Sequence, residues 1–122
     1  MEIAKICNSV LLDKFEYFLR KEVGKQLKRT DSPLVYHDFL RLLFHGTCAT
    51  DPSLIYDSEE GFDFRFAKET GMFGTGIYFA LDPAYSHLYA YKVKGTQNVY
   101  QMLISLVNTG RSKSYSASTS ET

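Results

Sequence analysis

Cysteine is scarce in this chain: only Cys7 and Cys48 occur among its 122 residues. A disulfide framework needs more cysteines than two, so the composition argues against a small disulfide-stabilised domain and favours a reducing compartment. The first residues are mixed in charge and contain no apolar segment of the kind found in signal peptides. We therefore expect an intracellular protein, in the nucleus or the cytoplasm. We expect Cys48 to be a small buried apolar residue rather than a modification target.

An excess of charge and a long apolar run are also missing. Fourteen basic residues balance fourteen acidic ones, so the formal net charge is zero. This balance argues against a dominant nucleic-acid-binding face, and the basic run over residues 20–29 is expected to be the solvated face of a helix. No apolar stretch approaches the roughly 18 residues that a spanning helix needs, so we expect no membrane partner.

The chain does contain enough apolar material for one domain. Hydrophobic residues make up 44% of it and aromatic residues 15%, the latter as nine tyrosines and nine phenylalanines. So rich a supply of aromatic rings is expected to line a cleft as well as a core. Residues 111–122 are instead Ser/Thr-rich and too poor in apolar side chains to order themselves. We therefore expect a folded domain over residues 1–110 and a flexible tail over residues 111–122.

Helical and strand patterns alternate along this domain. Asn8 or Ser9 can cap a helix for which Gly24 is either the end or a weak point. The apolar residues at helical spacing that we expect on one face of this helix are Val10, Leu11, Phe15, Phe18 and Leu19. Strands are predicted over residues 40–44, 77–80 and 99–107, and shorter helices over residues 52–61 and 83–91, each after an Asp-Pro start. We expect an α+β domain in which two small antiparallel sheets pack against each other, with helices outside and a cleft between the sheets.

Three short motifs could carry chemistry, and each also has a plain structural explanation. HGT at residues 45–47 puts an imidazole beside a glycine, where a flat ligand can approach the backbone; the alternative is a turn with a surface histidine. GTGIYFA at residues 74–80 permits a tight loop but lacks the third glycine of a dinucleotide fingerprint; the alternative is a turn before a core strand. PAYSHLY at residues 83–89 places Ser86 and Tyr89 on one helix face, which suits an aromatic amide; the alternative is a helix with core tyrosines.

Taken together and in order, these motifs resemble the catalytic domain of the poly(ADP-ribose) polymerase family. The pattern is LFHGT at residues 43–47, GFDxR at 61–65, GxGxYFA at 74–80 and YSxxY at 85–89. The resemblance covers about residues 3–110, and the FDxR and AYSH stretches look most like the mono-ADP-ribosylating branch. It implies an ADP-ribosyltransferase fold of split antiparallel β-sheets with flanking helices, here truncated at its C-terminal side.

The resemblance implies a nicotinamide pocket. Gly46 is expected to bind the nicotinamide carboxamide through its backbone, and Ser86 is expected to add its hydroxyl. Tyr78 and Tyr89 are expected to sandwich the nicotinamide ring. Such a grip would hold the ring in the twisted, near-attack geometry that glycosyl transfer needs.

The resemblance also implies how the sugar and the rest of NAD+ are held. His45 is expected to hydrogen-bond a hydroxyl of the nicotinamide-bearing ribose, and it is assigned with Tyr78 as a catalytic residue. Thr47 is expected to fix the His45 turn, and Arg65 to touch the adenosine half. Breaking the bond to nicotinamide develops positive charge on the ribose carbon. Because nicotinamide leaves as a neutral group, no strong acid or base is required.

One family motif has no counterpart in the chain. Its third position is a glutamate in polymer-forming members and often an apolar residue in mono-transferring ones, and it lies on a strand later than residue 107. Glu59, Glu60 and Glu69 come too early and Glu121 falls in the expected tail, so we assign no catalytic glutamate. We expect NAD+-dependent mono-ADP-ribosyl transfer to a protein acceptor. The alternatives are a catalytically impaired NAD-binding or regulatory fragment and a structural domain with a vestigial site. No ligand spacing supports a metal site, so none is expected.

Overall fold

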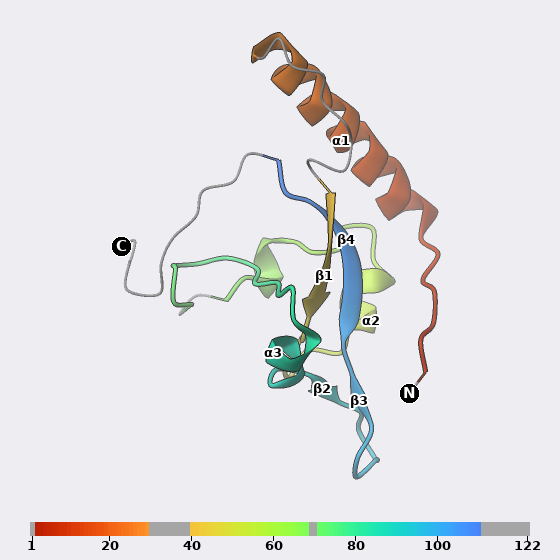
Figure 1. Ribbon diagram of the computed structural model, residues 1–122. Helices are drawn as coiled ribbons and strands as arrows, with labels where there is room; N and C mark the ends of the chain where they lie inside the picture. The colour runs from red at the N-terminus through yellow and green to blue at the C-terminus, as the bar shows by residue number, and fades with distance from the viewer. Residues whose placement is uncertain (1, 30–39, 69–70, 111–122) are drawn as a thin grey trace.

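The structure is a computed structural model that describes residues 2–29, 40–68 and 71–110 (Figure 1). The expected tail lies outside these residues, so its flexibility and the domain boundary stay predictions. The elements in chain order are α1 (Ser9–Arg29), β1 (Leu40–His45), α2 (Ser53–Tyr56), the 3-10 turn η2 (Phe64–Phe66), α3 (Pro83–His87), β2 (Tyr91–Lys92), β3 (Tyr100–Gln101) and β4 (Leu103–Asn108).

Two small antiparallel sheets form the strand part of the fold. β1 pairs with β4 over six residues, from Leu40 opposite Asn108 to His45 opposite Leu103. β2 pairs with β3 over two residues, and Figure 1 shows this hairpin leading into the start of β4. Helices and antiparallel strands in this arrangement confirm the predicted α+β class.

Helix α1 begins where its cap was predicted and docks on the α2 region. The Asn8 side-chain oxygen accepts from the backbone N–H of Leu11, at 3.2 Å, and its amide donates to the carbonyls of Tyr56 and Ser58, at 3.0 and 2.8 Å. Asn8 therefore caps the helix and also fixes its start against the chain after α2. The helix continues beyond Gly24, which was expected either to end it or to be a weak point within it, because helical hydrogen bonding tolerates a single glycine.

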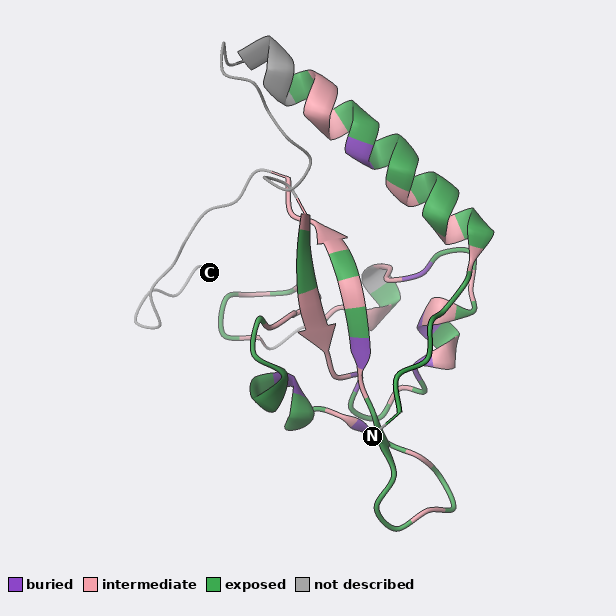
Figure 2. Ribbon diagram, turned by 45° about the vertical axis from the view of Figure 1, so that its right-hand side comes forward, coloured by how far each residue is buried: buried purple, intermediate pink, exposed green. Residues whose placement is uncertain are grey.

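The inner face of α1 is narrower than predicted. Leu11 and Phe15 are half-buried and Leu19 is buried, at a spacing of four residues that aligns them on one stripe. Val10 and Phe18, which were expected on the same face, are exposed. The helix therefore contacts the rest of the chain along a thin edge, and Figure 2 shows most of its surface exposed.

Four predicted elements are shorter than their patterns suggested. The first is the helix expected over residues 52–61, which is observed as α2 and ends at Tyr56. Residues 77–80 do not form a strand, because only Ala80 meets the edge of β1, through two hydrogen bonds with Phe44 at 2.8 and 2.9 Å. Helix α3 ends at His87, and Tyr91 belongs to β2. The strand expected over residues 99–107 is interrupted at Met102, which separates β3 from β4.

The buried core is small for a chain of this length. The buried apolar residues are Leu19, Ile55, Tyr91 and Leu103, among the residues that the structure describes. One face of the β1–β4 sheet leaves apolar side chains in solvent, namely Leu42, Ile104 and Leu106. Exposed apolar faces of this kind are typical of surfaces that other protein normally covers. Within the described part of the chain, no helix has the length and apolar character needed to cross a membrane.

Candidate active site

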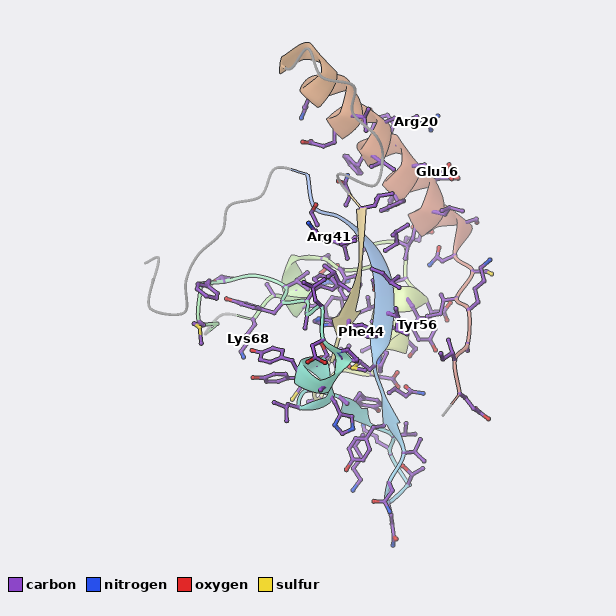
Figure 3. The ribbon with its side chains drawn as sticks, in the orientation of Figure 1. Glu16, Arg20, Arg41, Phe44, Tyr56 and Lys68 are labelled. Atoms are coloured by element: carbon purple, nitrogen blue, oxygen red, sulfur yellow. The ribbon has the colours of Figure 1, made fainter. Side chains whose placement is uncertain are left out.

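A cavity of about 550 Å³ opens at the end of β1. Its volume lies in the range of sites for small organic ligands. It is bounded by the HGT turn, by the loop that carries η2 and residues 71–80, and by α3 (Figure 3). The lining residues that matter below are His45, Gly46, Thr47, Lys68, Tyr78, Tyr85, Ser86 and Tyr89. Sheet packing does not create the cavity, because no described residue of β2, β3 or β4 lines it.

His45, the last residue of β1, lines the cavity as a neutral hydrogen-bond acceptor. Its Nδ1 lies 2.6 Å from the backbone carbonyl of Tyr78. A carbonyl can only accept, so Nδ1 carries the proton and Nε2 keeps a free lone pair. The ring packs against Phe62 and Phe79, with centroids 5.1 and 5.2 Å away. This burial lowers the pKa of His45, and the hydrogen bond to Tyr78 raises it by a smaller amount.

Gly46 is required by the packing of α3 against the end of β1. A Cβ atom at Gly46 would lie 2.5 Å from the Ser86 carbonyl oxygen and 2.5 Å from the Tyr89 carbonyl oxygen. The Cys48 N–H also donates to that Tyr89 oxygen, at 2.7 Å. The absence of a side chain at Gly46 therefore lets α3 approach the HGT turn, which places Ser86 and Tyr89 at the cavity.

Ser86 is fixed at the back of the cavity. It is 4% exposed, and its hydroxyl donates to the Phe44 carbonyl at 3.0 Å. With its proton engaged, the Ser86 oxygen can accept a hydrogen bond from a ligand N–H. The Asp82 side chain caps α3 by accepting from the Ala84 N–H at 2.9 Å, which secures the short helix that carries Ser86.

The loop around Tyr78 holds its ring in one position. Its hydroxyl donates to the Gly74 carbonyl at 2.5 Å and accepts from the Phe73 N–H at 3.2 Å. A side chain at Gly71 would collide with this hydroxyl. A tyrosine anchored at its tip presents its ring face to the cavity with little freedom to turn.

The rings of Tyr78 and Tyr89 both have the same ammonium over them. The Lys68 Nζ is 4.9 Å from the Tyr89 ring centroid and 6.0 Å from the Tyr78 centroid. We call the space that this ammonium shares with the two rings the aromatic slot. Tyr89 is 37% exposed, and its ring packs at 5.8 Å against that of Tyr85, whose pKa is raised by a hydrogen bond with Tyr89.

Of the seven residues predicted for the site, six line this one cavity and one does not. Thr47 is buried and closes the HGT turn, because its hydroxyl donates to the Thr50 carbonyl at 2.5 Å. Arg65 does not line the cavity; its guanidinium pairs with Asp63, with Nη2 at 2.8 Å from Oδ2. That pairing lowers the pKa of the Asp63 carboxyl. The binding roles of all seven residues stay predictions.

The sequence predictions assigned no site role to several cavity residues, Lys68 and Tyr85 among them, and placed one cysteine wrongly. Lys68 lines the cavity but lies outside the motifs, and Tyr85, the first residue of the YSxxY motif, lines it although no role was assigned to it. The YSxxY motif contains Tyr85 and could have drawn attention to it, whereas no local signal marks Lys68. The buried role expected for Cys48 is wrong: the residue is exposed, with a positive φ of 55°, because it forms the turn after β1. The described residues hold no group of three or more metal-binding side chains.

The profile described as the poly(ADP-ribose) polymerase catalytic domain matches residues 1–121. The chain belongs to this family.

A relative within the poly(ADP-ribose) polymerase family is a probable poly(ADP-ribose) polymerase from Dictyostelium discoideum. The two sequences are 43% identical over 76 residues, which is 62% of this chain and 22% of the relative. The chain thus spans less than a quarter of the length of that relative. The mixture of helices and antiparallel strands is consistent with the predicted ADP-ribosyltransferase catalytic fold.

Proposed function

We propose that this chain uses NAD+ as co-substrate and transfers a single ADP-ribose unit to a protein side chain, with release of nicotinamide. The observation that carries the proposal is the convergence of His45, Ser86, Tyr78 and Tyr89 on one cavity of suitable size. Membership of the poly(ADP-ribose) polymerase family supports ADP-ribosyl transfer in general. The FDxR and AYSH stretches support the mono-transferring form, and the scarcity of cysteine supports a location inside the cell.

In this proposal the aromatic slot binds the nicotinamide ring. The two tyrosine faces suit a flat pyridinium ring, since a cation is attracted to the face of an aromatic ring. The Ser86 oxygen accepts from the carboxamide N–H, and the Gly46 backbone contacts the same group. An amide held at one end and a ring held on both faces leave little rotational freedom about the glycosidic bond.

His45 positions the sugar in this proposal. Its Nε2 accepts a hydrogen bond from a hydroxyl of the nicotinamide-bearing ribose, because Nδ1–H is engaged by the Tyr78 carbonyl. When the C1′–N bond breaks, its electron pair goes to the nicotinamide nitrogen and the ring becomes neutral. An acceptor oxygen or nitrogen then bonds to C1′ and loses its proton to solvent. The fixed sugar keeps C1′ open to that attack.

A second candidate is an NAD-binding fragment that does not turn over. No acidic side chain lines the cavity among the described residues. A carboxylate near C1′ would stabilise the developing positive charge, so its absence from this part of the chain favours binding without chemistry. This candidate predicts thermal stabilisation by nicotinamide with no product.

The experiment that tests the proposal is incubation of the chain with labelled NAD+ and a mixture of acceptor proteins. The proposal predicts covalent labelling that is lost in His45→Ala and retained in His87→Ala, a histidine outside the cavity lining. Equal labelling by wild type and His45→Ala would contradict it. Saturable binding of NAD+ with no label would select the second candidate instead.

A further inference from the structure

Lys68 places a positive charge in the aromatic slot. Its Nζ lies 4.9 Å from the centroid of Tyr89 and 6.0 Å from that of Tyr78. Both distances fall within the roughly 6 Å over which a cation is attracted to a ring face. Figure 3 shows the Lys68 side chain reaching from its loop toward α3. The ammonium therefore occupies the place that the proposed function gives to the pyridinium ring.

The backbone of Lys68 is fixed, and its side chain is free to swing. The Lys68 N–H donates to the Gly76 carbonyl at 2.7 Å, and the Gly76 N–H donates to the Lys68 carbonyl at 3.1 Å. Lys68 is exposed overall, so the ammonium can leave the slot without being buried elsewhere. Its flexible four-carbon stem lets the charge move while the loop stays in place.

We propose that Lys68 sets the preference of this site for the dinucleotide over free nicotinamide, a role that rests on the proposed function. Any ring that enters the slot must first displace the ammonium. NAD+ carries a pyrophosphate on the same ribose, and in this proposal the displaced ammonium pairs with its phosphate oxygens. Free nicotinamide carries no phosphate, so it displaces the charge without offering it a partner.

The size of this preference follows from the two contacts. A cation over an exposed ring gains enough free energy to weaken any competing ligand by about twofold to fivefold. Displacing the ammonium lowers the affinity of both nicotinamide and NAD+ by this factor. Only NAD+ regains the lost affinity, because an ammonium–phosphate pair at a solvent-accessible site raises the affinity by a factor of similar size.

The test compares Lys68→Ala with Lys92→Ala, an exposed lysine of β2 outside the cavity lining. Affinities for nicotinamide and for NAD+ are measured by calorimetry. In Lys68→Ala we expect nicotinamide to bind about twofold to fivefold more tightly, while NAD+ binds equally or less tightly. Lys92→Ala should change neither. Unchanged nicotinamide affinity, or equal tightening of both ligands, would overturn the role of Lys68. A wild-type chain that binds neither ligand would overturn the proposed function itself.

A measurement without ligand tests the position of the Lys68 ammonium independently of the proposed function. The carbon and protons at Cε of Lys68, assigned by their loss in Lys68→Ala, should show upfield NMR shifts from the ring currents of the tyrosines. Tyr89→Leu should return them toward the values of an exposed lysine. Ordinary lysine shifts in the wild-type chain would show that the ammonium is not in the slot, whatever the activity of the protein.

Discussion

Replacing Gly46 with alanine adds one methyl group where α3 meets the end of β1. The new Cβ would lie 2.5 Å from the Ser86 carbonyl oxygen, the Tyr89 carbonyl carbon and the Tyr89 carbonyl oxygen. All three are backbone atoms, so none can rotate away, and the segment that carries Ser86 and Tyr89 must move. Two hydrogen bonds span this contact, from the Ser86 hydroxyl to Phe44 and from the Cys48 N–H to Tyr89, and both would lengthen or break.

The expected loss of stability combines overpacking with those hydrogen bonds. Forcing a methyl group into a packed contact costs about 1–3 kcal/mol, and each net hydrogen bond about 0.5–1.5 kcal/mol. The lower ends of these ranges give a destabilisation of about 2 kcal/mol. For a chain of this size, that corresponds to a fall in Tm of about 6–12 °C.

The matched control is Gly24→Ala, the same chemical change in the interior of α1. A Cβ at Gly24 meets nothing within 4 Å, so the helix propensity of alanine should raise stability by about 0.5–1 kcal/mol. Thermal unfolding followed by circular dichroism, with and without nicotinamide, measures both variants. A Gly46→Ala chain with the wild-type Tm and nicotinamide affinity would refute the reasoning, because α3 would then not depend on that contact.

Three further predictions concern the ring anchor, the imidazole and the cap of α1. Tyr78→Phe removes the hydroxyl bonded to Gly74 and Phe73, so we expect a loss of about 1–2 kcal/mol of stability and a severalfold weaker nicotinamide affinity; calorimetry showing unchanged affinity would contradict the anchoring role. Because burial lowers the pKa of His45, NAD+ affinity should hold as pH falls through about 6.5 and decline below it. Stability should decline in the same window, since the unfolded chain there binds more protons than the folded one. His45→Asn should abolish that pH dependence in an affinity titration. Asn8→Ala should lower the free energy of unfolding by about 1 kcal/mol through loss of the α1 cap, which a lower Tm would show, and leave nicotinamide affinity unchanged.

The sequence predicted the elements whose signals are local. The cap at Asn8, the strand that ends at His45 and the Asp82 start of α3 depend on neighbouring residues, and each is present. The strand over residues 77–80 was wrong, because strand formation depends on a partner along the whole segment and β1 offers one only at Phe44. Helix lengths erred for a similar reason, since tertiary contacts decide where a helical pattern stops.

The sequence predicted most of the expected site residues, but not the packing contacts that bring them together. Ordered motifs identified His45, Tyr78 and Ser86, which the fold brings to one cavity. Nothing local signals that Gly46 is needed for the approach of α3, because that constraint depends on atoms 40 or so residues later in the chain. Lys68 was missed for the same reason: its meeting with Tyr89 is visible only in three dimensions.

The most direct test is an NMR titration of the chain, with labelled tyrosine rings, against nicotinamide. The nine tyrosine signals can be assigned by single Tyr→Phe variants. Saturable shifts at the ring signals of both Tyr78 and Tyr89, with none at the distant Tyr17 of α1, are the predicted result. Saturation with shifts confined to other tyrosines, or no shift at millimolar nicotinamide, would contradict a nicotinamide site between these two rings.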